Sequence, residues 1–197
     1  MRPAHLVPAT RADLDALPRN VVGEIIDGVL YAFPRPRPRH AKALLRLSSR
    51  LELAYDQGVG GPGGWVILAE PGIELPRSPE VVPDIAGWRI ERLGELDLDA
   101  RLTEVPDWVC EVLSPSNRRH DLITKKPYYA SIGVRWLWIA DSAAREVTAY
   151  RLGADGLWSE LATFGDSDML RVEPFDAIEI DVSTLWDVGP AKSPVAD

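Results

Sequence analysis

The stretch that most constrains this chain runs from residue 107 to residue 141, where a charged residue interrupts an apolar segment. Residues 108–113, WVCEVL, have the continuous apolar character of a strand buried on both faces, apart from Glu111. A buried carboxylate costs several kcal/mol unless a metal ion or a basic side chain compensates it. A polar turn, a helix with two lysines and a second apolar strand follow. The sequence therefore predicts a strand–helix–strand unit whose acidic residue needs a partner.

The length and composition predict one ordinary globular domain. A chain of 197 residues with 46% hydrophobic content is long enough for one sizeable core. We expect a single domain over residues 1–188, with a disordered tail over 189–197 because GPAKSPVAD has too little apolar content to pack. The single Cys110 rules out an intrachain disulfide bond and favours a reducing compartment.

The charge and the hydropathy limit the cellular compartments and the binding partners that we expect. The first residues, MRPAHLVPAT, contain no apolar segment typical of a signal peptide, and no run of about 18 apolar residues occurs. A cytoplasmic protein that does not enter the membrane is therefore expected. A net charge of -8 argues against broad coating of nucleic acid, although a local basic patch is compatible with this charge.

The remaining segments alternate between strand and helix patterns. Residues 10–17 predict a short helix capped by Thr10, and the dipeptide Asp27-Gly28 predicts a hairpin between strands at 21–26 and 29–33. Residues 34–40, PRPRPRH, are expected to be an extended basic connector because prolines alternate in it. The other expected elements are an amphipathic helix that ends at Gly58, strands at 65–70, 72–75 and 81–88, an irregular excursion at 89–106, an antiparallel pair at 145–152 and 157–164, and a closing strand and helical turn at 177–186.

Asp84 is the residue expected to meet Glu111. It follows a proline within the apolar run at 81–88, and it faces Glu111 if the two strands are neighbours. Two such carboxylates repel each other unless a divalent cation lies between them, and Mg2+ suits oxygen ligands and a phosphate oxygen. A metal-bound water is a better nucleophile at neutral pH. Lys125 and Lys126 follow in the next element and are the candidate cationic side chains at the attacking water.

The order of these residues resembles the Uma-two family of the restriction-endonuclease-like PD-(D/E)XK nuclease superfamily. The resemblance covers roughly residues 10–151 and rests on GEIIDG, His40, Pro83-Asp84, PDWVCEVLSPS, Asp121, Lys125, Tyr129, Gly133-Val134 and Trp138. It implies an α/β (α+β) fold with a central mixed sheet flanked by helices. It also implies a Mg2+- or Mn2+-dependent endonuclease acting on DNA, with Asp84 and Glu111 holding the metal ion.

The catalytic lysine that the resemblance implies is missing from its usual place. The Glu-x-Lys position reads Glu111-Val112-Leu113, so Lys125 supplies the charge only if the lysine has moved to the following helix. The resemblance implies the family's spacing Asp-x-x-x-Lys-x-x-x-Tyr, which favours Lys125 over Lys126. Pro127 predicts that the helix begins near Lys125 or kinks there, which places Lys125 near a helix end.

Each candidate also has a structural interpretation. In the structural interpretation, Glu111 and Lys125 form a buried salt bridge without a catalytic role. Asp107 is better explained as a turn residue. Asp121 and Lys125 have the spacing of an exposed helical ion pair. Glu24 is expected as an exposed carboxylate on a strand, and His40 as a capping residue. All three of Glu24, His40 and Asp121 are also accessory candidates for the site. The tryptophans and Tyr129 are expected in the core.

A basic cluster is the one feature that opposes the acidic composition. It is a candidate surface for a phosphate backbone and consists of Arg35, Arg37, Arg39, His40, Lys42, Arg46 and Arg50, with Arg118, Arg119 and His120 nearer the metal site. A solvated surface is the alternative. Three functions remain open: a DNA-cleaving homodimer, a catalytically inactive module that binds nucleic acid or a protein partner, and an oligomerisation scaffold.

Overall fold

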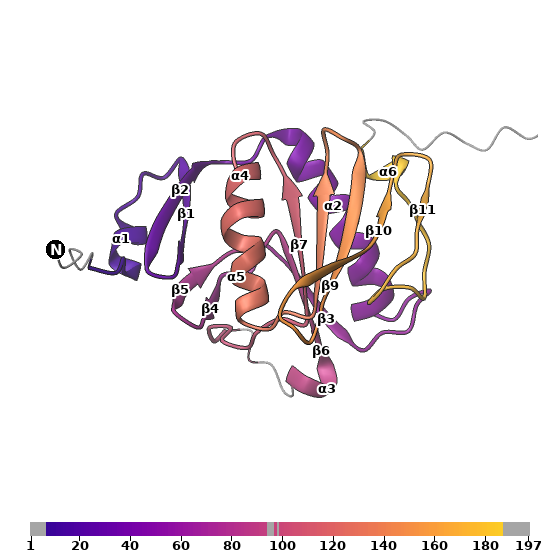
Figure 1. The fold of residues 1–197 in the computed structure, drawn as a ribbon, viewed down its shortest axis with the longest axis horizontal. Helices are drawn as coiled ribbons and strands as arrows, with labels where there is room; N and C mark the ends of the chain where they lie inside the picture. The colour runs from indigo at the N-terminus through magenta and orange to yellow at the C-terminus, as the bar shows by residue number, and fades with distance from the viewer. Residues whose placement is uncertain (1–6, 94–96, 98, 187–197) are drawn as a thin grey trace, which may run out of the picture.

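The computed structural model describes residues 7–93, 97 and 99–186, and a mixed six-stranded sheet lies at its centre (Figure 1). The strand order is β10-β9-β8-β7-β6-β3, in which only the neighbours β7 and β8 run parallel. These strands are β3 (Trp65–Ala69), β6 (Ile85–Arg89), β7 (Trp108–Leu113), β8 (Trp136–Asp141), β9 (Glu146–Leu152) and β10 (Trp158–Phe164). The expected mixed sheet with flanking helices is confirmed.

A smaller sheet carries the N-terminal hairpin. Its order is β2-β1-β5-β4, with β1 (Val21–Ile26), β2 (Val29–Pro34), β4 (Ile73–Leu75) and β5 (Ser78–Val81). The hairpin turns at Asp27 and Gly28, whose φ angles of 50° and 77° fit the mirror-image turn expected for this dipeptide. The expected single strand at 81–88 is wrong, because Pro83 and Asp84 separate β5 from β6. Helix α1 (Arg11–Asp15) precedes the hairpin and is capped through Thr10 and Asp13.

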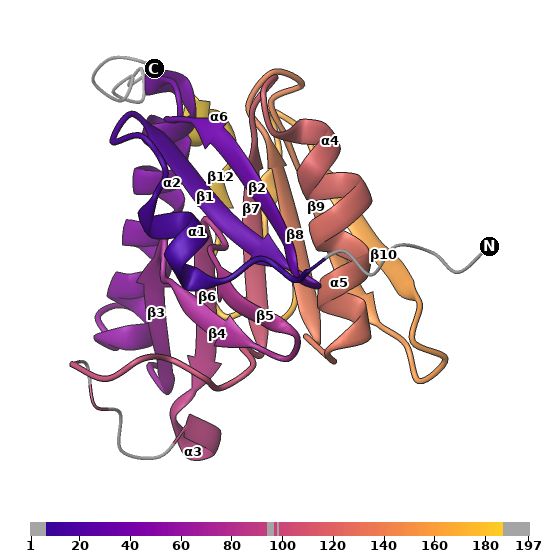
Figure 2. The same cartoon turned by 90° about the vertical axis from the view of Figure 1, so that its left-hand side faces the viewer.

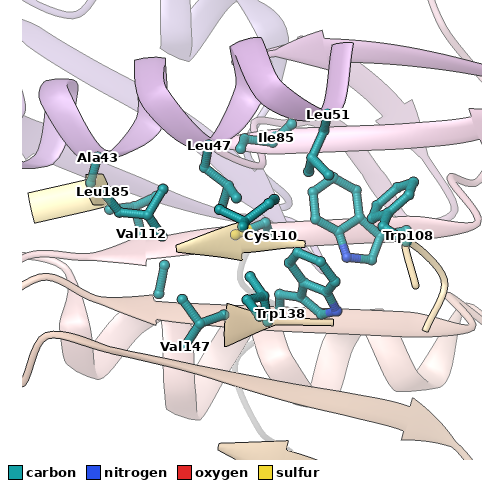
Figure 3. Close-up of a cluster of buried hydrophobic side chains, with 14 of the residues drawn as sticks. Ala43, Leu47, Leu51, Ile85, Trp108, Cys110, Val112, Trp138, Val147 and Leu185 are labelled. Carbon is teal, nitrogen blue, oxygen red and sulfur yellow. The ribbon is translucent and has the colours of Figure 1, made fainter. Parts of the chain in front are cut away.

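One face of the central sheet packs against helix α2 (Pro38–Leu51). A turn of π-helix, η1 (Glu52–Asp56), extends α2, and β11 (Met169–Leu170), β12 (Ile180–Asp181) and α6 (Ser183–Trp186) complete this layer. Figure 3 shows Leu47 and Leu51 of α2 beside Cys110, Trp108 and Trp138 of the sheet. The expected extended connector at 34–40 is only partly right, because Pro38 begins the helix, where a missing N–H costs nothing.

The other face is covered by a helical segment and, beyond it, by the hairpin β1–β2 (Figures 1 and 2). The segment consists of α4 (Arg118–His120), the π-helical turn η2 (Asp121–Lys125) and α5 (Lys126–Ser131). Side chains alternate along β7, so Cys110 and Val112 pack toward α2 while Val109 and Leu113 pack toward α5. Glu111 shares the face of Val109 and Leu113 and therefore points toward the helical segment.

The position of Lys125 within this segment differs from the prediction. The helical conformation is continuous from Arg118 to Ser131, so Lys125 lies in its middle and not near an end. Proline has no N–H and crowds the carbonyl four residues earlier, which a regular α-helix cannot accommodate. Here the wider π-helical turn precedes Pro127, and such turns accommodate irregularities within a helix.

Two further expectations concern the edges of the described structure. The excursion at 89–106 contains one short helix, α3 (Ile90–Leu93), but residues 94–96 and 98 lie outside the described residues, as does the tail at 189–197. The expected pair of strands around Gly153 to Gly156 is confirmed by β9 and β10. Within the described ranges, every helix is too short or too polar to span a bilayer.

Candidate active site

Asp84 lies directly before β6, opposite Glu111 of the neighbouring strand β7. The antiparallel register of β6 and β7 pairs Ile85 with Cys110, so the preceding residue, Asp84, faces Glu111. Asp84 Oδ2 accepts a hydrogen bond of 2.6 Å from the backbone N–H of Val112, which fixes its carboxylate against β7. The sheet thus brings together the two carboxylates that the sequence proposed as a pair.

Glu111 is held by two side chains from the helical segment. Lys125 Nζ lies 2.8 Å from Oε1 and donates a hydrogen bond of 2.9 Å to Oε2, and the Tyr129 hydroxyl donates to Oε1 at 2.7 Å. The carboxylate is 1% exposed. Burial raises the pKa of Glu111 well above its ordinary value, an effect that the attraction of Lys125 only partly offsets. The cationic partner of Glu111 is therefore Lys125.

Lys125 is surrounded by acidic groups. Its ammonium also donates to the carbonyl of Val82 at 2.9 Å, and it lies 3.8 Å from Glu24 and 4.0 Å from Asp121. Burial lowers the pKa of this lysine, but the surrounding carboxylates outweigh burial and raise it above its ordinary value. Lys125 therefore stays protonated, which suits it to stabilise negative charge and not to remove a proton from water.

Glu24 reaches the same place from the hairpin. It is buried and not exposed as its strand position suggested, and its Oε1 lies 2.8 Å from His120 Nε2. Its Oε2 accepts a hydrogen bond from the N–H of Val82. Burial opposes ionisation, yet Lys125 and His120 together lower the pKa of Glu24. Glu24 thus remains a carboxylate and links the hairpin to the helical segment.

His40 takes a similar position beside Asp84. It is 2% exposed, and its Nε2 lies 3.0 Å from Asp84 Oδ2. Burial lowers the pKa of His40, but the hydrogen bond and the charge of Asp84, together with the charges of Glu70 and Asp121, raise it by more. His40 is therefore a buried partner of Asp84 and not a solvated cap at the start of α2.

Asp121 has an oxygen without a protein partner. The side chain is 1% exposed, and its Oδ2 makes no hydrogen bond among the described residues. Burial raises the pKa of Asp121 to about 7, against the attraction of Lys125. A carboxyl group with this pKa exchanges protons near neutral pH, which an exposed helical ion pair does not do.

A cleft of about 330 Å3 lies between the hairpin, the start of α4 and the end of β7, and part of this group lines it, whereas Glu111 and His40 do not. Its lining includes Glu24, Asp84, Asp121 and Lys125. A pocket with a few convergent polar groups and shifted pKa values is the usual form of a small binding or catalytic site.

The other candidates lie outside the cleft or at its edge. Lys126 faces away, with its ammonium 3.4 Å from the ring centre of Tyr150, so the structure separates it from the site. Asp107 binds Arg92 and the N–H of Arg89, a structural role close to the one expected. Among the arginines of the basic cluster, Arg35 lines the cleft.

Two residues of the site had no role assigned from the sequence. Tyr129 was expected only as a core residue, and His120 only as part of a basic patch. A buried tyrosine hydroxyl needs a hydrogen-bond partner, and Tyr129 lies four residues after Lys125, so helical spacing places both side chains on the face of Glu111. His120 carries no such signal, because its partner Glu24 is 96 residues away.

The residues available for a metal ion are oxygen ligands. Among the described residues, no three His, Cys, Asp or Glu side chains are arranged to hold an ion. Asp84 and Glu111 provide two adjacent carboxylates, and Mg2+ is commonly bound by one or two carboxylates together with waters and substrate phosphate oxygens. The acidic groups also outnumber the cationic ones, and Asp121 Oδ2 is unpartnered. The oxygen donors of this group are of the type that a hard divalent cation binds.

Comparisons with known proteins identify the fold and the family. The structure of a protein titled "putative nuclease belonging to DUF820" from Anabaena variabilis superimposes with a TM-score of 0.68 at 19% identity, covering 91% of this chain and 98% of that one. The two proteins therefore share an α+β fold. Residues 11–183 match the Uma2 family, described as "Putative restriction endonuclease", and the chain belongs to this family. No curated protein sequence matches.

Proposed function

We propose that this protein is a metal-dependent nuclease that hydrolyses phosphodiester bonds in DNA at the cleft. The observation that carries the proposal is the buried group formed by Asp84, Glu111 and Lys125. A carboxylate directly before β6, a second one on β7 and a protonated lysine of η2 lie close enough for both carboxylates to act on the lysine. Membership of a family described as restriction endonucleases supports the same chemistry.

Asp84 and Glu111 would hold the divalent cation, which when bound supplies Lewis-acid activation of the phosphate and of the attacking water. Tyr129 and the N–H of Val112 orient the two carboxylates through their hydrogen bonds. Lys125 offers a permanent positive charge to the negative charge that develops on the phosphate. These residues are in position before any substrate arrives.

Asp121 is the group suited to accept a proton from water. It lines the cleft, its Oδ2 is unpartnered, and its pKa of about 7 matches a general base that works near neutral pH. Lys125 cannot take this role while the carboxylates keep it protonated. Charge stabilisation therefore falls to Lys125 and proton transfer to Asp121.

The test is cleavage of single-stranded and duplex DNA by the purified protein with Mg2+ or Mn2+. Asp84→Asn and Glu111→Gln should each reduce cleavage by at least about a hundredfold, because each removes a carboxylate oxygen on which metal binding depends. Arg77→Gln, an exposed change in a pair with Asp27, is the control and should cleave like the parent. Circular dichroism must show that the variants are folded. Absence of cleavage with either metal, or full activity of folded Glu111→Gln, would refute the proposal.

A second candidate function is DNA binding without catalysis. Both oxygens of Glu111 are already engaged by Lys125 and Tyr129, and Leu113 stands where the superfamily resemblance implies a lysine. An inactive module should bind DNA equally well in EDTA and with Mg2+, and Asp84→Asn should not alter that affinity. Metal-dependent cleavage would exclude this alternative.

A further inference from the structure

The cleft is walled and small, which limits what can reach its carboxylates. On one side lie residues of the hairpin and the connector that follows it, including Phe33, Pro34 and Pro36, and on the other lie Ser114 and Asn117. A volume of about 330 Å3 is at the lower end of the range for pockets that hold one small molecule. A specific duplex interface instead buries about 1,000 to 2,500 Å2 of protein surface. The cleft has the dimensions of a site for one nucleotide.

The hairpin wall presents an aromatic ring to the cleft. Phe33 is partly exposed, and its ring centre lies 4.8 Å from that of His120, which in turn lies 4.3 Å from Tyr31. His120 is fixed by its contact with Glu24, so Phe33 rests on a rigid support. Single-strand binding proteins use such aromatic rings to stack unpaired bases, and the bases of a duplex are not available for stacking.

Few of the arginines near the cleft are free to bind phosphate. Arg118 pairs with Asp141, and Arg39 donates to the carbonyl of Ser142. Arg46 and Arg50 both bind Thr184 of α6. Among the described residues, the side chains of Arg37 and Arg119 make no hydrogen bond or ion pair, and Arg35 makes only a long contact of 3.5 Å. Two or three free arginines suit a short single strand better than a duplex, which presents phosphates on both strands.

We propose that the substrate is single-stranded DNA, with one nucleotide in the cleft, its base against Phe33 and the adjoining phosphates on Arg35 and its neighbours. This proposal rests on the nuclease function in one respect only, namely that the phosphate bound in the cleft belongs to DNA. Binding itself can be measured without metal and without catalysis.

The experiment is fluorescence anisotropy in EDTA with a labelled oligo-dT and with a blunt hairpin duplex. The parent protein should bind the single strand at least about tenfold more tightly than the duplex. Phe33→Ala should weaken single-strand binding by about tenfold, as expected for loss of one stacked base. Phe33→Tyr, which keeps an aromatic ring, should retain the affinity. Val29→Ala is the control, because Val29 is an exposed apolar residue of the same hairpin that does not line the cleft.

The salt dependence provides an independent measurement. Contact with two or three phosphates of a single strand predicts a slope of log K against log salt between about -1.4 and -2.1. Equal or tighter binding of the duplex, or a Phe33→Ala variant that binds like the parent, would overturn the proposal. If either of these results were found while the protein cleaved duplex DNA with Mg2+, the single-strand proposal would be refuted and the nuclease function would be retained. Tight single-strand binding without any cleavage would instead support this inference and remove the nuclease function.

Discussion

The buried ion pair between Glu111 and Lys125 explains how an acid can lie inside the central strand. An isolated carboxylate there would be expelled or neutralised, whereas here an ammonium and a hydroxyl satisfy its oxygens. The sequence predicted that Glu111 needs a cationic partner, and the spacing Asp121-x-x-x-Lys125 pointed to the correct lysine. It could not show that Glu24 joins the same group, since that depends on where the hairpin packs.

Substitution of either partner of the ion pair should lower the free energy of unfolding. Lys125→Met leaves several buried carboxylates without compensation, so we expect a loss of about 3 to 5 kcal/mol in the free energy of unfolding. The double variant Glu111→Gln/Lys125→Met should lose less than the sum of the single variants, because the unpaired charge is removed with its partner. Urea unfolding followed by tryptophan fluorescence measures all three.

Arg77→Met is the control for this cycle, since Arg77 pairs with Asp27 at the surface and its loss should barely move the unfolding midpoint. A Lys125→Met protein as stable as the parent, or strictly additive changes, would show that the pair is not coupled as its geometry implies.

The stability should also depend on pH through Asp121. Its pKa is raised to about 7 in the folded protein, against 3.8 for an ordinary aspartate, so its contribution to stability is present below about pH 4 and is lost as the pH rises through 7. Asp121→Asn cannot ionise. The melting temperature of this variant, relative to the parent in EDTA, should therefore rise between about pH 4 and pH 8. A constant or falling difference would contradict the raised pKa.

The elements around the site show why local patterns succeed at some places and fail at others. The hairpin and the β9–β10 pair follow from apolar runs separated by turn residues, and β7 and β8 follow from continuous apolar runs, all of which are local properties. The break between β5 and β6 and the π-helical turn before Pro127 do not, because each depends on how a proline is accommodated in three dimensions. These two irregular elements position Asp84 and Lys125.

The hairpin turn that holds Glu24 in place should be sensitive to its glycine. Gly28 has a φ angle of 77°, and a Cβ added there would lie 3.1 Å from Pro8 Cβ. Gly28→Ala should therefore cost about 1 kcal/mol, the strain of a left-handed backbone on an L-residue. Gly165→Ala is the matched control, because its backbone is ordinary and its Cβ would meet only Asp168 Oδ2 at 3.6 Å. Chemical denaturation compares the two, and equal stabilities would contradict the strain.

At the scale of the whole molecule, the type of DNA substrate determines whether a homodimer is expected. Cleavage of both strands of a duplex often uses two active sites, which was the reason to expect a homodimer. A single-stranded substrate needs one cleft only, so the homodimer remains a prediction that cleavage of a duplex would strengthen. Fold class and family followed from the sequence because the diagnostic residues are spread over most of the chain. The walls of the cleft could not be predicted from the sequence, because residues near positions 33 and 117 come together only after folding.

The C-terminal segment closes the core on the face opposite the cleft, and Phe175 is its central contact. Its ring is 1% exposed and lies 4.6 to 5.5 Å, between ring centres, from four aromatic residues: Tyr55, Trp65, Trp108 and Trp138. Phe175→Ala removes contacts to η1, β3, β7 and β8 together, so the free energy of unfolding should fall by about 3 to 5 kcal/mol. Phe175→Leu should lose less, and Leu157→Ala, at an exposed turn, should lose little. Urea denaturation measures these differences. A Phe175→Ala protein within about 1 kcal/mol of the parent would mean that the segment contributes little to the stability of the core.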